Sequence, residues 1–177
     1  MFAKKQALKK ENTKSRTSTI MMGRAAPVEE AKEKTKALVY VAKFGGSSVA
    51  SGERFKEVYK IIEEAYLKKE DRPCIVMSAM GKTTNNLLEA GDKALKEGKV
   101  DISAIADLTR KTIEELQLEA VAEEVEELLK ELESLLTGVT MLKELSPRSK
   151  DYLVSFGERI STRLFAEYCR KRGTPAA

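Results

Sequence analysis

The sequence predicts an α/β protein in which helices predominate, and three observations support this class. Two short runs of β-branched, aromatic and other apolar residues, at 38–44 and 73–79, have the composition of strands. A stretch with helical spacing of apolar residues separates them, which gives a strand–helix–strand unit whose crossover is nearly always right-handed. From residue 84 onward, the apolar residues recur at helical spacing up to about residue 172.

The strand–helix–strand unit is the first part of the predicted fold. After the strand at 38–44, a helix is expected from about Ser51 to Leu67. Its apolar residues are spaced by three or four positions and form one face: Phe55, Val58, Ile62 and Ala65. The second run, 73–79, is almost wholly apolar, which predicts a strand buried on both faces of a parallel sheet.

Helices are expected in the rest of the chain. The first runs from Thr84 to about Lys96 and is broken at Gly98. The second runs from Ser103 to about Leu118, and its apolar residues again follow the helical period.

The next helix carries a heptad-like pattern. Its apolar residues keep alternating spacings of four and three positions: Val121, Val125, Leu128, Leu132 and Leu135. Gly138 is a candidate C-cap for this helix. The pattern fits either a dimerising coiled coil or a helix packed within its own domain. Because the pattern lasts for fewer than three repeats, we favour an antiparallel helical pair within the domain.

The final helix is predicted to begin at Ser146-Pro147, an N-cap residue followed by proline at the first helical position. It is expected to run to about Arg172 and to end at Gly173 and Pro175. A third strand is expected immediately after Gly173, because a sheet of two parallel strands is too small to complete a layered domain. The chain is therefore expected to be an incomplete domain.

Charge is distributed unevenly along the chain. Residues 1–36 hold ten Lys/Arg and four acidic residues, whereas residues 37–177 hold 22 basic and 24 acidic residues. A nucleic-acid-binding domain would carry its basic residues on the folded part, so no nucleic-acid partner is expected. No apolar run approaches the ~20 residues of a membrane span, so no membrane partner is expected either.

The expected division is an extension at 1–36 and one folded part at 37–177. The extension is rich in Lys, Arg, Ser and Thr and poor in acids up to Val28, which is typical of an organellar transit peptide. A disordered basic extension fits the same composition, and the two interpretations stay open.

Two residue types limit the chemistry of the chain. Histidine is absent, which excludes a histidine base or a histidine-ligated metal site within this chain. Cys74 and Cys169 do not make a disulfide framework, so a reducing compartment is the safer interpretation. No residue is assigned as a metal ligand.

The first candidate site is a run that leads from a strand into a turn: Lys43-Phe44-Gly45-Gly46-Ser47-Ser48. A lysine at the carboxyl end of a strand points into the crevice where open α/β sheets bind their ligands. Glycines let the backbone approach phosphate oxygens, and a helix N-terminus follows. We therefore predict a polyphosphate site. The alternative is an ordinary strand-to-helix turn that needs glycine for its dihedral angles.

A second candidate turn is Gly81-Lys82-Thr83-Thr84. It resembles the end of a P-loop, but that pattern requires a glycine five residues before Gly81, where the chain has Val76. A true P-loop is therefore not expected. Because the two candidate turns follow adjacent strands, they are expected to face the same crevice.

A third candidate lies within the final helix, at Ser155-Phe156-Gly157-Glu158-Arg159-Ile160-Ser161-Thr162. Gly157 costs the helix ~1 kcal/mol relative to alanine, and such a glycine usually permits the close approach of a backbone or a ligand. Glu158 can offer a carboxylate to a cationic group. The alternative is a surface ion pair between Glu158 and Arg159 or Arg163.

Together these motifs resemble those of the aspartokinases in order and spacing. The matching runs are Lys43–Ala50, Ser78–Asn85 and Ser155–Ser161, and the resemblance covers about residues 38–173. It is closest to the monofunctional plastid enzymes of plants. Ser47 stands where many members of the family carry threonine, an exchange that keeps the hydroxyl group.

The resemblance implies the amino-acid kinase fold, an αβα sandwich around a mainly parallel sheet, with residues 37–177 as its N-terminal portion. It implies transfer of the γ-phosphoryl group of ATP, with Mg²⁺, to the side-chain carboxylate of L-aspartate, the first step of lysine, threonine and methionine biosynthesis. It also implies a homo-oligomer for the full-length protein. If the basic extension is a transit peptide, the expected location is the plastid, and otherwise the cytoplasm.

The resemblance also implies roles for individual residues. Lys43 is the expected catalytic residue, because its ammonium would neutralise charge on the transferring phosphoryl group. The residues expected around the phosphates are Lys43, Phe44, Gly45, Gly46 and Ser47. The aspartate substrate is expected to contact Ser47, Thr84 and Glu158, the last through its α-ammonium group. A carboxylate nucleophile is deprotonated at neutral pH, so the absence of histidine costs this reaction nothing.

Other features of the family are not in this sequence, namely an Arg-Gly-Gly-Ser-Asp segment, the nucleotide-base pocket and the regulatory domains. We therefore expect the polypeptide alone to bind ATP poorly and to show no measurable aspartate kinase activity. One alternative is a non-catalytic truncated isoform that pairs with full-length subunits. Another is a different member of the amino-acid kinase family, such as acetylglutamate kinase or uridylate kinase.

Overall fold

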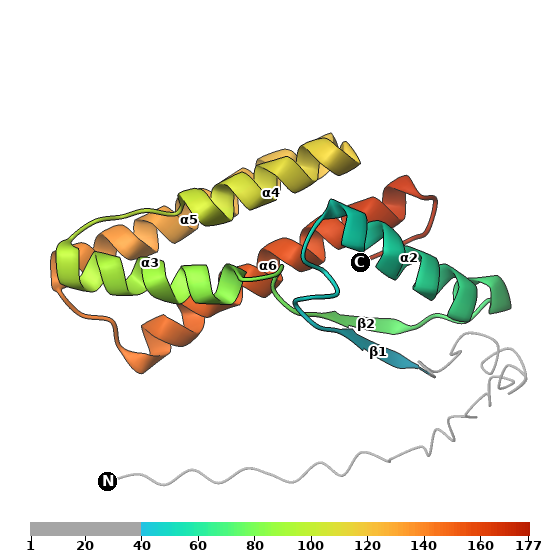
Figure 1. Cartoon of the computed structure of the whole chain (residues 1–177), viewed down its shortest axis with the longest axis horizontal. Coiled ribbons are helices and arrows are strands. Elements are labelled where there is room, and N and C mark those ends of the chain that lie inside the picture. Colours follow the sequence, from blue (N-terminus) through green and yellow to red (C-terminus); the bar gives the residue numbers. More distant parts are fainter. Residues whose placement is uncertain (1–39) are drawn as a thin grey trace, which may run out of the picture. The chain divides into compact units, whose positions relative to one another are not determined.

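The computed structural model describes residues 40–177, so the predictions for 1–36 lie outside the described residues. Contacts between residues group 37–177 into one unit. Its elements are β1 (Val41–Phe44), α2 (Gly52–Ala65), a short 3-10 helix η1 (Leu67–Lys69), β2 (Cys74–Met77), α3 (Thr83–Glu97), α4 (Ser103–Leu116), α5 (Glu119–Leu142) and α6 (Pro147–Lys171). All of them except η1 are labelled in Figure 1.

The predicted strand–helix–strand unit is confirmed. β1 and β2 pair in parallel, with Val41 opposite Cys74 and Phe44 opposite Met77. α2 connects them, and the Ser51 hydroxyl caps it by accepting a hydrogen bond from the Arg54 amide at 3.3 Å. The buried residues on the apolar side of this helix are Phe55, Val58, Tyr59 and Ile62, which is close to the predicted face.

The sheet is not buried on both faces, so that prediction for the second strand was wrong. Burial alternates along both strands. Met77 belongs to the core and Phe44 packs against it, whereas Val41 and Val76 are 71% and 44% exposed. The reason is that the described helices pack against only one face of the two strands (Figure 1).

The helical part of the chain is built from mutual packing of α3, α4, α5 and α6 (Figure 1). α5 contacts each of the other three and contributes one apolar stripe to the core. The buried residues of that stripe are Val121, Val125, Leu128, Leu129, Leu132, Leu136 and Val139. The heptad-like pattern therefore serves packing within the domain, as favoured above, and the stripe is not left open for a second chain.

α6 begins as predicted, at Ser146 followed by Pro147, with the Ser146 hydroxyl accepting from the Ser149 amide at 3.1 Å. It ends at Lys171, whose ammonium donates to the Leu116 carbonyl at 3.0 Å and so satisfies the C-terminus of α4. Residues 174–177 form no strand. Within the part of the chain that the structure describes, no helix has the length and apolarity to cross a membrane.

Gly138 does not cap a helix, which corrects the prediction. α5 continues through it to Leu142, and its C-cap is Lys143 at φ 54°. The helix continues because its apolar stripe extends to Val139 and keeps this turn packed on the core.

Replacing Gly138 by alanine is expected to stabilise the chain. A Cβ atom added there would meet nothing within 4 Å, so only the helix propensity changes, by ~0.5–1 kcal/mol in favour of alanine. Urea denaturation should show a higher midpoint with an unchanged slope. An unchanged or lower midpoint would mean that this turn of α5 frays in solution.

The two cysteines are expected to differ in reactivity. Cys74 is exposed, whereas Cys169 is 8% exposed and burial raises the pKa of its thiol to about 11. A thiol reagent should therefore label one cysteine in the native chain and the second only after denaturation, because the thiolate is the reactive form. Cys74→Ser should remove the native labelling, and Cys169→Ser should leave it. Rapid labelling of the Cys74→Ser variant would contradict the burial of Cys169.

Candidate functional site

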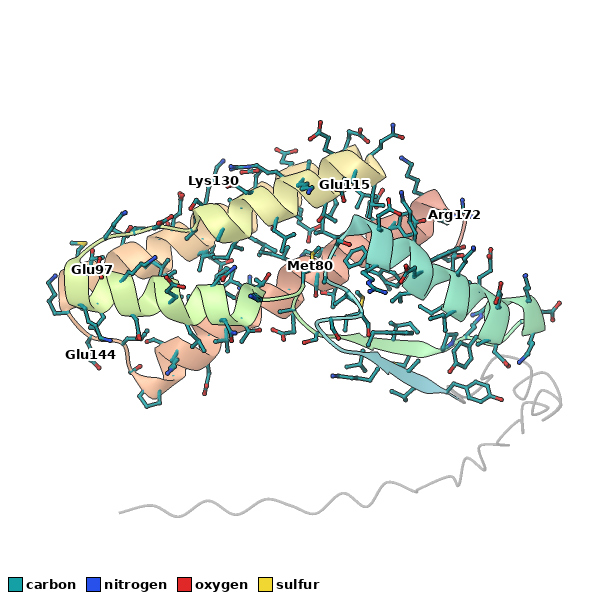
Figure 2. All side chains as sticks on the ribbon, in the orientation of Figure 1. Met80, Glu97, Glu115, Lys130, Glu144 and Arg172 are labelled. Atoms are coloured by element: carbon teal, nitrogen blue, oxygen red, sulfur yellow. The ribbon has the colours of Figure 1, made fainter. Side chains whose placement is uncertain are left out.

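The candidate site lies where β1 and β2 end, since the carboxyl ends of parallel strands meet at one edge of a sheet. Each strand leads into a turn that precedes a helix. We call residues 45–48 the glycine turn and residues 78–82 the second turn. Met80, labelled in Figure 2, lies in the second turn, where the chain passes from β2 into α3.

Lys43 is the last residue but one of β1 and is exposed. Its Nζ lies 3.6 Å from the position that a Cβ atom would take at Gly45, so the ammonium reaches toward the glycine turn. Among residues 40–177 it has neither an ion-pair partner nor a hydrogen bond. A cation without a carboxylate partner at the end of a strand is open to an anionic ligand.

The glycine turn is compact. The Ser48 amide donates to the Gly45 carbonyl at 2.9 Å, and the Val49 amide donates to the Gly46 carbonyl at 3.3 Å. Within residues 40–177, the amides of Gly45, Gly46 and Ser47 donate to no acceptor. Such a row of unpaired amides beside a lysine suits a phosphate group.

The two turns, which were expected to face the same crevice, contact each other directly. The Gly81 amide donates to the Gly46 carbonyl at 3.0 Å. A Cβ atom at Gly46 would lie 3.1 Å from the Ala79 carbonyl oxygen, so only glycine fits there without a shift. Gly81 itself has φ 53°, in the left-handed region. The Thr83 hydroxyl closes the second turn by donating to the Met80 carbonyl at 2.7 Å.

α6 contacts the second turn through the third motif. The Glu158 Oε1 accepts a hydrogen bond from the Ala79 amide at 3.2 Å. The Ser161 hydroxyl donates to the Ser78 carbonyl at 2.9 Å. Gly157, which precedes Glu158, brings α6 so close that an added Cβ atom would lie 2.6 Å from the Ala79 Cβ. The close approach predicted for Gly157 is therefore confirmed.

The surface ion pair considered for Glu158 does not form. Arg159 pairs instead with Glu131 of α5 at 2.8 Å, and Arg163 pairs with Glu124. Because both arginines are turned toward α5, Glu158 is left with the Ala79 amide as its contact outside its own helix.

The ion pair between Arg159 and Glu131 connects α6 to α5 beside the site. Hydrogen bonds from the Tyr152 hydroxyl and then from Arg159 lower the pKa of the Glu131 carboxyl. Burial tends to lower the pKa of the Arg159 guanidinium, but its bonds to Glu131 and Tyr152 outweigh this and raise the pKa. The guanidinium also lies over the Phe156 ring, 4.6 Å from its centroid.

The structure links most of the predicted site residues through the two turns. Lys43, Gly45 and Gly46 lie at the glycine turn, and Glu158 reaches the second turn through Ala79. Thr84 is the second residue of α3 and half-buried. Within residues 40–177, no ion pair joins Lys43 to Glu158. Two surface grooves lie along α3, and neither is lined by Lys43, Thr84 or Glu158.

Ser161 and Ala79 are contacts for which sequence reasoning assigned no role. The only signal for Ser161 was a polar residue on the apolar side of a helix, and it is fully buried. Ala79 contacts α6 through its backbone amide and its small side chain. Neither group distinguishes it in the sequence from any other alanine.

A comparison with known proteins finds a family model and several relatives that match this chain. The model described as the Amino acid kinase family matches residues 39–177. Aspartokinase 1, chloroplastic, of Arabidopsis thaliana is 50% identical over 147 residues, which are 80% of this chain and 25% of the relative. Lysine-sensitive aspartokinase 3 of Escherichia coli is 34% identical over 145 residues, which are 78% of this chain and 30% of the relative.

A solved structure is similar as well. The crystal structure of E. coli aspartokinase III in complex with aspartate and ADP matches with a TM-score of 0.64 and 29% identity, over 76% of this chain and 29% of that one. The chain thus spans about a quarter to a third of the length of these relatives.

Proposed function

Because the chain belongs to the amino acid kinase family, we propose that it supplies the phosphate turn and part of the amino-acid site of an aspartate kinase. The proposed reaction transfers the γ-phosphoryl group of ATP to the side-chain carboxylate of L-aspartate. The observation that carries the proposal is the contact of the two turns, in which the Gly81 amide bonds the Gly46 carbonyl while Glu158 holds the Ala79 amide.

The phosphate half consists of Lys43 and the glycine turn. Phosphoryl transfer depends on positioning and on neutralising the charge of the transferring group. The ammonium of Lys43 beside Gly45, and the amides of Gly45, Gly46 and Ser47, suit that task. The described residues hold no cluster of three or more acidic, cysteine or histidine side chains for a metal ion. Mg²⁺ bound to the phosphates of ATP would neutralise part of their charge.

The amino-acid half consists of Ser47, Thr84 and Glu158. Glu158 uses Oε1 for the Ala79 amide, and among residues 40–177 its Oε2 accepts no hydrogen bond. That second oxygen suits the α-ammonium group of an amino acid, which makes a charge-assisted hydrogen bond with a carboxylate. The hydroxyl groups of Ser47 and Thr84 suit the substrate carboxylates.

We also propose a plastid location for the protein. The support is the 50% identity to a chloroplastic relative and the acid-poor, hydroxyl-rich composition of residues 1–36.

The proposal is tested in a chimeric kinase, in which residues 40–177 replace the matching segment of Arabidopsis aspartokinase 1. With ATP and Mg²⁺, the chimeric kinase should form 4-phospho-L-aspartate, trapped as the hydroxamate. Glu158→Gln should raise KM for aspartate by roughly tenfold to a hundredfold and change KM for ATP little, since one charge-assisted contact is lost. Glu167→Gln, a carboxylate near the end of α6 that pairs with Arg170, is the matched control and should change neither constant. A folded chimera that forms no acyl phosphate would overturn the proposal.

A further inference from the structure

We propose that Ser161 is a positioning residue, through which α6 sets the position of the second turn and thereby of the glycine turn. The inference rests on the proposed function for its consequence in catalysis. Its structural content, the coupling of α6 to both turns, can be tested independently of that function.

Ser161 of α6 contacts Ser78 of the second turn directly. Ser161 is 0% exposed, and its hydroxyl donates to the Ser78 carbonyl at 2.9 Å across 83 positions of sequence. It has a second bond, at 3.2 Å, to the Glu158 carbonyl in its own helix. A buried hydroxyl that bridges two segments fixes their distance, because losing it would leave the half-buried Ser78 carbonyl without this donor.

α6 holds the second turn at three neighbouring points. Besides the Ser161 bond, Glu158 accepts from the Ala79 amide at 3.2 Å. Gly157 packs its bare Cα against the Ala79 side chain, leaving no space for a Cβ atom. One carbonyl, one amide and one methyl group of residues 78 and 79 are therefore all fixed by a single turn of α6.

On its other side, the second turn packs closely against the glycine turn. The Gly81 amide donates to the Gly46 carbonyl at 3.0 Å. A Cβ atom at Gly46 would lie 3.1 Å from the Ala79 carbonyl oxygen and 3.2 Å from the Gly81 carbonyl oxygen. A close-packed contact of this kind transmits a displacement instead of absorbing it.

The consequence is that one hydroxyl acts on both halves of the proposed site. If Ser161 is lost, α6 holds the second turn only through the Glu158 hydrogen bond and the Gly157 contact, both at Ala79, so the turn is free to shift at Ser78 and to displace Glu158 together with Ala79. The glycine turn, fastened through Gly81, is loosened at the same time. Neither effect requires Ser161 to touch a ligand.

The test uses the full chain and backbone amide hydrogen exchange measured by NMR. In Ser161→Ala, the amides of Ala79 and Gly81 should exchange at least roughly tenfold faster than in the unaltered chain. The Ser48 and Val49 amides of the glycine turn should follow, whereas amides of α5 keep their rates. The matched control is Thr162→Ala, which removes the next hydroxyl along α6, whose bonds go only to its own helix. It should leave all these rates unchanged.

A second readout is titration with inorganic triphosphate, followed at the amides of Gly45 and Gly46. Ser161→Ala should bind it at least roughly fivefold more weakly than the unaltered chain or Thr162→Ala. If the unaltered chain shows no triphosphate-dependent shift while the exchange pattern is as expected, the phosphate role fails and the positioning role stands. If triphosphate binds all three proteins equally, Ser161 does not position the glycine turn.

Two exchange results would overturn the inference. One is equal acceleration at every amide, including those of α5, which would give Ser161 a merely structural role. The other is unchanged exchange at Ala79 and Gly81. Should Ser161→Ala fail to fold, Ser161→Cys provides the second variant, because its side chain leaves no cavity while its thiol is a much weaker donor than the hydroxyl. Its rates at Ala79 and Gly81 should be raised relative to the unaltered chain, and unchanged rates would again overturn the inference.

Discussion

Replacing Gly157 by alanine is expected to destabilise the chain and to push the second turn away from α6. The added Cβ atom would lie 2.6 Å from the Ala79 Cβ and 3.7 Å from the Ala79 Cα. The first of these atoms is attached rigidly to the backbone of a residue that is 2% exposed, so no side-chain rotation relieves the contact. Relief requires movement of the turn or of the helix.

The sign of this effect follows from two opposing magnitudes. Alanine in place of glycine inside a helix contributes ~1 kcal/mol of stability. Forcing an extra methyl group into a close-packed contact costs ~1–3 kcal/mol. We therefore expect a net loss of about 1–2 kcal/mol in the free energy of unfolding, measured by urea denaturation. The Glu158–Ala79 hydrogen bond should lengthen at the same time, which faster exchange of the Ala79 amide would report.

Gly138→Ala is the matched control, because the same substitution in α5 meets nothing within 4 Å. The two variants should shift the midpoint in opposite directions. If both stabilise the chain by a similar amount, α6 does not approach the second turn as closely as the structure has it. Intact exchange protection of Ala79 in the Gly157→Ala variant would lead to the same conclusion.

These two glycines also show how far the sequence predicts the fold. Both stand within segments of helical spacing, and local sequence cannot say which of them approaches another backbone and which is only tolerated. Gly157 was correctly interpreted as a close contact, because a glycine inside a helix costs stability and usually permits the close approach of a backbone or a ligand. Gly138 was interpreted as a helix end, because a glycine after a heptad pattern is a common C-cap. In the structure the helix continues through Gly138, because Val139 packs on the core.

The elements that follow from periodicity were predicted well, and those that depend on neighbours were not. The parallel pair of strands, α3 and the start of α6 follow from spacing and capping residues. The exposure of Val76 could not be predicted in this way. An apolar run has the same sequence pattern whether helices cover one face of the strand or both faces. In the candidate site, Lys43 and the glycine turn were predicted from local chemistry. The role of Ser161 was not, because its partner, the Ser78 carbonyl, is a backbone group 83 positions away.

Replacing Lys43 by methionine is expected to reduce kcat of the chimeric kinase by about a hundredfold to a thousandfold, the usual cost of removing one group that stabilises the charge of a transition state. The ammonium lies beside Gly45 and has no partner among residues 40–177. Its removal therefore breaks no contact of the folded protein, and the free energy of unfolding should hardly change. KM for aspartate should also change little, because the proposed aspartate contacts are Ser47, Thr84 and Glu158.

Lys60→Met is the matched control for Lys43→Met. Lys60 is an exposed lysine of α2, so the control removes the same charge from the molecule while leaving the end of β1 intact. It should keep kcat within about twofold, since a distant exposed charge is screened by solvent. Comparable losses in both variants would mean that net charge, and not the placement of Lys43, governs the rate. An active Lys43→Met enzyme would remove the catalytic role from Lys43, because no other side chain of β1 or of the glycine turn carries a positive charge.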